Sequence, residues 1–140
     1  MRFWDSSAIA PIIVAESASA SMRALADDET GLAVWWAAPV ECASAVARRE
    51  RSGVLTPEGA SEALATLELL AGDWSEVPPS DRLRDDARRL VRVHDLRTAA
   101  AFQLAAARAA SDEQPESLPF VTLDERLALA ARREGFSVLP

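Results

Sequence analysis

The sequence predicts an α/β fold, in which a parallel sheet of four or five short strands is flanked by helices. Short apolar runs alternate along the chain with longer segments of helical periodicity, which is typical of parallel sheets. The chain has 140 residues and 49% hydrophobic content, enough to bury one core. It has no internal repeats, so we expect a single domain spanning residues 1–140.

Four elements are expected in the first third of the chain. They are a strand at Met1–Trp4, helices at Ser6–Val14 and Glu16–Asp28, and a strand at Leu32–Trp36. Ser6 and Ser7 suit a helix start, whereas Pro11 is tolerated only near a first turn, so we expect the first helix to begin late or to bend. Of the adjacent Trp35 and Trp36, one side chain should face the core and the other the opposite side.

Prolines at helix starts and glycines at helix ends predict the remaining elements. The expected helices cover Pro39–Ser52, Pro57–Leu70, Asp81–Val93 and Asp124–Glu134, and the expected strands cover Trp74–Val77, Phe120–Leu123 and Ser137–Leu139. A further, alanine-rich helix should end near Ala110, with His94 and Asp95 as its cap. Ser111–Pro119 is polar and is expected to be a loop.

Composition and charge exclude several classes of protein. The net charge of −7 argues against a broad basic surface for nucleic acid but leaves room for a local one. No apolar run approaches the roughly 20 residues of a membrane span, and the N-terminus does not resemble a signal peptide. Cys42 is the only cysteine, so we expect a cytoplasmic protein in which Cys42 is a small buried residue.

Acidic residues follow three of the expected strands. Asp5 follows the first, Glu41 lies in the first turn of the helix after the second, and Asp124 follows Phe120–Leu123. Each acid alone is explained by a helix cap or by the dipole of a first turn. Because the carboxyl ends of parallel strands share one edge, however, the three carboxylates should meet and bind Mg²⁺ or Mn²⁺. Such an ion can polarise a phosphodiester and activate water.

Four short motifs resemble, in this order, those of PIN domains, and most closely those of the VapC toxins of bacterial VapBC toxin–antitoxin systems. The motifs are Asp5-Ser6-Ser7-Ala8, Pro39-Val40-Glu41, Leu96–Ala105 and Val121–Leu127. The resemblance covers nearly the whole chain and implies a PIN-like three-layer sandwich. It implies a magnesium- or manganese-dependent endoribonuclease, with Asp5, Glu41 and Asp124 as catalytic metal ligands. Ser6 and Thr122 match positions that orient carboxylates or water.

The same resemblance implies three partners: an RNA substrate, a VapB-like antitoxin and a second copy of the chain in a homodimer. An apolar stripe on the first two helices would help to form the antitoxin groove. The stripe consists of Ile9, Ile12, Ile13, Met22 and Leu25. Arg97 is the strongest single prediction for a phosphate or antitoxin contact. Arginines also cluster at 48–51 and 82–92, and the second cluster is most simply an ion-paired, solvated face.

The third motif departs from the family at Ala100, where similar sequences carry an aspartate. On a helix, Asp95 would lie about 140° around the axis from position 100, so it should not replace the missing aspartate. We therefore expect weak metal binding and impaired RNA cleavage, and the sequence leaves open whether the alanine is natural or introduced. The alternative is a catalytically dead PIN domain that binds RNA or antitoxin. An unrelated phosphate-handling enzyme with Asp5 as nucleophile would need a lysine, and the chain has none.

Overall fold

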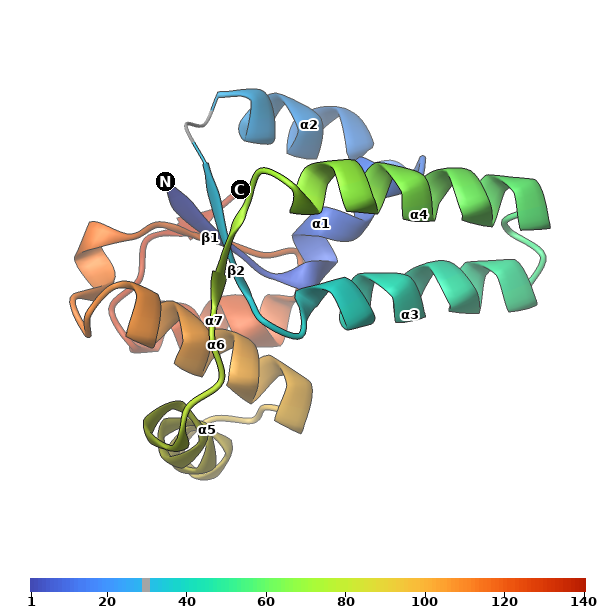
Figure 1. Ribbon diagram of the computed structural model, residues 1–140. Coiled ribbons are helices and arrows are strands. Elements are labelled where there is room, and N and C mark those ends of the chain that lie inside the picture. The colour runs from blue at the N-terminus through green and yellow to red at the C-terminus, as the bar shows by residue number, and fades with distance from the viewer. Residues whose placement is uncertain (29–30) are drawn as a thin grey trace.

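A parallel sheet forms the centre of the fold, which is described by a computed structural model for residues 1–28 and 31–140 (Figure 1). Within these residues the sheet has five strands in the spatial order β3-β2-β1-β4-β5. They are β1 (Arg2–Trp4), β2 (Leu32–Trp35), β3 (Ser75–Val77), β4 (Phe120–Val121) and β5 (Val138–Leu139). Phe3 pairs with Ala33 on one side and with Phe120 on the other. The predicted parallel sheet is confirmed.

Helices cover both faces of the sheet (Figure 1). One face carries α1 (Ser6–Ile13), α2 (Ser19–Asp27), α3 (Ala38–Arg51) and α4 (Pro57–Ala71). The other carries α5 (Asp81–Val93), α6 (Thr98–Ala110) and α7 (Glu125–Arg133), and a short 3-10 turn at Pro115–Ser117 precedes β4. The molecule is therefore the expected three-layer sandwich.

Alternation along the strands builds two cores, one on each face. Phe3 and Phe120 stack with ring centroids 5.3 Å apart and pack against α5, α6 and α7. Their neighbours Trp4 and Val121 point the other way and pack against α1, α3 and α4. Because both faces are covered, these strands are apolar on both sides, as is usual for parallel sheets.

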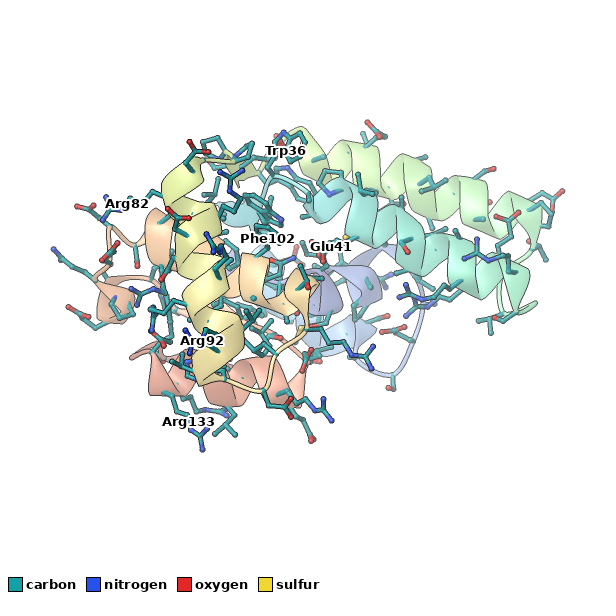
Figure 2. All side chains as sticks on the ribbon, turned by 90° about the horizontal axis from the view of Figure 1, so that it is seen from below. Trp36, Glu41, Arg82, Arg92, Phe102 and Arg133 are labelled. Carbon is teal, nitrogen blue, oxygen red and sulfur yellow. The ribbon has the colours of Figure 1, made fainter. Side chains whose placement is uncertain are left out.

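The tryptophan pair at the end of β2 behaves as predicted. Trp35 is buried and stacks on Phe102 of α6, with ring centroids 5.5 Å apart, whereas Trp36 is 56% exposed. Figure 2 shows Trp36 at the end of the sheet from which α3 departs. Cys42 is fully buried, as expected.

The first helix begins at Ser6, as its expected range does, and continues through Pro11, so it does not begin late. Two other expected helix starts were wrong. The second helix begins at Ser19 rather than Glu16, since the Ser19 hydroxyl accepts the Glu16 N–H (2.8 Å) and donates to the Val14 carbonyl (3.1 Å). These bonds hold residues 16–18 in a turn.

The other correction concerns the alanine-rich helix, which begins at Thr98 and is not capped by His94 or Asp95. His94 instead ends α5, where its N–H donates to the Leu90 carbonyl (3.0 Å). Its ring lies 2.7 Å from Glu134 of α7, and this contact fixes it away from the start of α6.

The apolar stripe predicted for an antitoxin groove is largely core. Ile9, Ile13 and Met22 are buried, and Ile12 and Leu25 are partly buried against the same cluster. The chain itself therefore covers most of this stripe. None of the helices in the described residues is long and apolar enough to cross a membrane.

Candidate active site

The three predicted acids line one cavity of about 620 Å³ at the carboxyl edge of the sheet. Asp5 follows β1 and Asp124 follows β4, which are adjacent strands, and Glu41 lies in the first turn of α3 after β2. The helices that follow β1 and β4 pack on opposite faces of the sheet. Chain connections that diverge in this way open a crevice between the two strands, and this crevice is where α/β proteins bind ligands.

Asp5 is the most buried of the three acids, with 5% exposure. Its Oδ2 caps α1 by accepting the Ser7 N–H (3.3 Å), and it also accepts hydrogen bonds from the hydroxyls of Ser7 and Thr122, the latter at 2.9 Å. Burial raises the pKa of Asp5; these hydrogen bonds oppose the rise, and the nearby Asp124 charge adds to it. All three bonds go to Oδ2, so they leave Oδ1 available.

Glu41 is half-buried on α3 and is held from α6. Its Oε1 accepts a hydrogen bond from Nε2 of Gln103 (3.2 Å). Burial raises the pKa of Glu41, the hydrogen bond from Gln103 opposes the rise, and the charge of Asp5 adds to it. The same surroundings raise the pKa of the Cys42 thiol to about 12, first through burial and then through Glu41 and Asp5.

Asp124 is exposed at the rim and caps α7. Its Oδ1 accepts the N–H groups of Arg126 (2.9 Å) and Leu127 (3.1 Å), and its own N–H donates to the Thr122 hydroxyl (3.0 Å). The capping explanation therefore holds for both aspartates. It does not exclude a ligand role, because the capping bonds occupy only one oxygen of each carboxylate.

The donor set of this cavity fits a hydrated Mg²⁺ or Mn²⁺. Magnesium is usually held by one or two carboxylates and keeps several waters. The charge of Asp5 raises the pKa of Glu41 and the charge of Asp124 raises that of Asp5, and a cation would relieve this repulsion. In the part of the chain that the structure describes, no three His, Cys, Asp or Glu side chains form a preformed metal-binding group. An ion here would therefore complete its coordination with water.

Ala100 lines the acid cavity at the position where an aspartate was expected. Asp95 does not line it. It borders an adjoining cavity of about 320 Å³, where it is largely exposed and lies 3.7 Å from Arg126. Arg97, the N-cap residue of α6, borders this second cavity too, and Ala100 and Asp124 line both. Arg97 is thus adjacent to the acids rather than among them.

The two arginine clusters differ in their relation to the acids. Arg48 and Arg49 line the acid cavity, and Arg49 is paired with Glu16 at 2.8 Å. Three arginines of α5 instead form ion pairs one turn apart, including Arg88 with Asp85 at 3.7 Å. Figure 2 shows Arg82 and Arg92 well away from Glu41. The solvated-face interpretation is confirmed for Arg84 and Arg88, whereas Arg89 also pairs with Glu134 of α7.

Sequence reasoning missed two polar residues of this site. Ser7, not Ser6, donates to Asp5, and it also accepts the Leu123 N–H at 3.0 Å. The hydroxyl of Ser6 accepts from Gln103 (2.9 Å). Gln103 is the more informative omission, because it is a lone amide in the apolar stretch Ala99–Ala107, and a polar residue at such a position signals a buried partner.

Comparison with known proteins identifies the fold but not a family. No family model matches the sequence, and no curated protein matches it either. Among solved structures, the chain is similar to the crystal structure of FitAcB from Neisseria gonorrhoeae, with a TM-score of 0.69 and 16% sequence identity. The likeness covers 100% of this chain and 97% of that chain. The fold is PIN-like. At this identity the likeness concerns the fold alone, so the VapC assignment stays a prediction.

Proposed function

We propose that this PIN-like chain is a PIN-type toxin with the activity of a VapC-like endoribonuclease, the hydrolysis of RNA phosphodiester bonds with Mg²⁺ or Mn²⁺. One observation carries the proposal: Asp5, Glu41 and Asp124 line a single cavity at the point where the connections of the sheet diverge. The PIN-like fold supports it, because this fold brings the acids of three separate motifs to one edge. The raised pKa values of Asp5 and Glu41 support it too, since such shifts cluster at functional sites.

In this proposal the chain's own residues bind and orient. Asp5 and Glu41 hold the ion through the carboxylate oxygens that protein donors leave available, and Asp124 contributes from the rim. Thr122 and Ser7 fix the orientation of Asp5. When bound, the ion would polarise the phosphodiester and lower the pKa of a bound water.

Ala100 weakens this site in the proposal. The affinity of hard cations for a protein site depends on how many charged ligands it offers. Helix α6 contributes no carboxylate to the cavity, because its cavity-lining residues are Ala99, Ala100 and Gln103. The chain is therefore expected to bind magnesium poorly and to cut RNA slowly.

We further propose a VapB-like antitoxin as partner, a homodimer, and a cytoplasmic location. The stripe on α1 and α2 is packed inside the chain, so an antitoxin would instead contact the rim of the acid cavity. Val40 is 71% exposed there, and Arg97 is exposed at the adjoining cavity. An exposed apolar residue at one cavity and an exposed arginine at the adjoining one suit a helix or strand that carries both apolar and acidic side chains.

A second function is favoured by Ala100 itself. With the α6 acid absent and no preformed group of three ligands among the described residues, the chain could serve as a non-catalytic module that binds RNA or antitoxin. The two functions differ in their response to one substitution. A module does not gain hydrolysis when an acid is placed at position 100.

The test is an RNA digestion assay with Mg²⁺, with Mn²⁺ and with chelator. We expect Ala100→Asp to cleave at least roughly tenfold faster than the parent chain, because it restores a charged ligand. Chelator, or Asp5→Asn in the same background, should abolish the gain. Ala110→Asp is the matched control, since it adds the same charge at the exposed end of α6. RNA binding without cleavage by Ala100→Asp would favour the module instead.

A further inference from the structure

Gln103 is the buried polar residue of the acid cavity that the proposed mechanism does not yet use. It lies on α6, one turn after Ala100, and is 1% exposed. Its Nε2 donates to the Ser6 hydroxyl at 2.9 Å and to Glu41 Oε1 at 3.2 Å. Its Oε1 is buried and has no hydrogen-bond partner among the residues that the structure describes.

This arrangement is unfavourable for packing alone. A buried carbonyl without a donor costs about 1–3 kcal/mol, whereas an apolar side chain of similar volume at this position would leave no polar atom unpaired. Apolar residues are common at buried positions of α6, since its neighbours Ala101 and Leu104 are almost completely buried. The compensation is the bond to Glu41, because hydrogen bonds to a carboxylate are stronger than those between neutral groups.

The bond also selects between the two oxygens of Glu41. Gln103 holds Oε1, and hydrogen bonds that orient a metal-binding carboxylate commonly fix which oxygen faces the ion. Gln103 reaches Glu41 from the helix that lacks the expected acid. Helix α6 therefore contacts the site through a neutral amide rather than through a charge.

We propose that Gln103 is a positioning residue, which holds Glu41 so that its other oxygen is presented to a divalent cation. This inference rests on the proposed function, because it takes Glu41 as a metal ligand. It adds a residue that acts through Glu41 and does not itself touch the ion. It also explains why a buried amide with an unpaired carbonyl is present in an otherwise apolar helix.

The experiment compares two apolar replacements of similar size, Gln103→Met and Gln103→Leu, by calorimetric titration with Mn²⁺. Both are made in the chain as it is and in Ala100→Asp. We expect each to weaken Mn²⁺ affinity about tenfold to hundredfold, the usual effect of removing a hydrogen bond that orients a ligand. Leu104→Met is the matched control, because Leu104 is the next residue of α6 and is buried in the core rather than lining the acid cavity.

The outcomes separate this inference from the proposed function. Unchanged Mn²⁺ affinity in both Gln103 variants would overturn the inference, and so would an equal loss in Leu104→Met, which would indicate a general packing effect. If neither parent background binds Mn²⁺, the proposed metal site itself fails, and the inference fails with it. Thermal unfolding of each variant, followed by circular dichroism, shows whether the fold is retained.

Discussion

Two groups of buried carboxylates in this molecule have opposite electrostatic surroundings. In the acid cavity, burial and mutual repulsion raise the pKa values of Asp5 and Glu41. Between α5, α6 and α7, burial alone would raise the pKa of Glu134. Hydrogen bonds from Arg89 and His94, with the charge of Arg108, outweigh burial, and the net result is a lowered pKa.

The second group is an ion-pair network with its charges matched. Glu134 accepts hydrogen bonds from Arg89 at 2.8 Å and from Arg108 at 3.0 Å, and the two arginines also bind Asp86 at 3.1 and 2.7 Å. His94 lies 2.7 Å from the same glutamate. This network ties the three helices of one layer together and needs no ligand.

The difference is the one expected between structural acids and the functional acids that we propose. Where the chain pairs its buried carboxylates with arginines, their charge serves the fold. In the acid cavity the carboxylates receive hydrogen bonds from hydroxyls, an amide and backbone N–H groups, and the salt bridges in the described residues do not include Asp5 or Glu41. This is the electrostatic pattern that the proposed cation site requires, because the protein does not neutralise these carboxylates with its own cations.

The comparison predicts its largest effect in the network. Glu134→Gln leaves Arg89 and Arg108 without their shared carboxylate, and we expect a loss of about 3 kcal/mol in the free energy of unfolding. Urea unfolding at neutral pH measures this loss. Glu68→Gln on the exposed face of α4 is the control and should change stability by less than about 0.5 kcal/mol. A loss as small as that of the control would show that the network is not structural.

Removal of a charge from the acid cavity should not lower the free energy of unfolding, in contrast to Glu134→Gln. The raised pKa values of Asp5 and Glu41 mean that their contribution to stability is full below the unfolded-state pKa values and is lost as pH rises through the folded-state values. With chelator present at pH 8, the free energy of unfolding of Glu41→Gln should therefore equal that of the parent or exceed it by up to about 1 kcal/mol.

The measurement is urea unfolding at a series of pH values from about 5 to about 8. The parent should lose stability relative to Glu41→Gln as pH rises, since only the parent must ionise this buried glutamate. Apparent Mn²⁺ affinity of the parent should rise over the same range, because the ion competes with protons for Asp5 and Glu41. A parent that gains stability relative to the variant on going to pH 8 would contradict the proposed electrostatics.

The smallest expected effect tests whether the comparison extends to the arginines. Arg97 borders the cavity next to the acids, whereas Arg88 is paired with Asp85. Arg97→Ala should weaken RNA binding to a similar extent for all sequences. It should also reduce the slope of log K against log salt concentration by about 1, the value for one lost phosphate contact. Arg88→Ala should leave both unchanged. Equal effects of the two substitutions would mean that RNA binds over a general basic surface.

Element types were largely predictable because local chemistry determines them. A proline in the first turn and a capping threonine define α4, and short apolar runs define β1, β2 and β4. Helix starts were less predictable. His94 is held by Glu134, 40 residues away, whereas Ser19 bonds to Glu16 and Val14 within its own turn, which hydrophobic periodicity does not register. The stripe on α1 and α2 was ambiguous for a similar reason, because periodicity shows that a face is apolar but not what covers it.

The sequence by itself determined the order of strands and helices, the two cores implied by strand alternation, and the three positions where an acid follows a strand. Only the tertiary structure decided how these acids differ. It turned one oxygen of Asp5 towards Thr122 and placed Gln103 against Glu41. The physical reason is that hydrogen bonds between residues 62 or 117 positions apart depend on how the helices pack on the sheet, which no local pattern encodes.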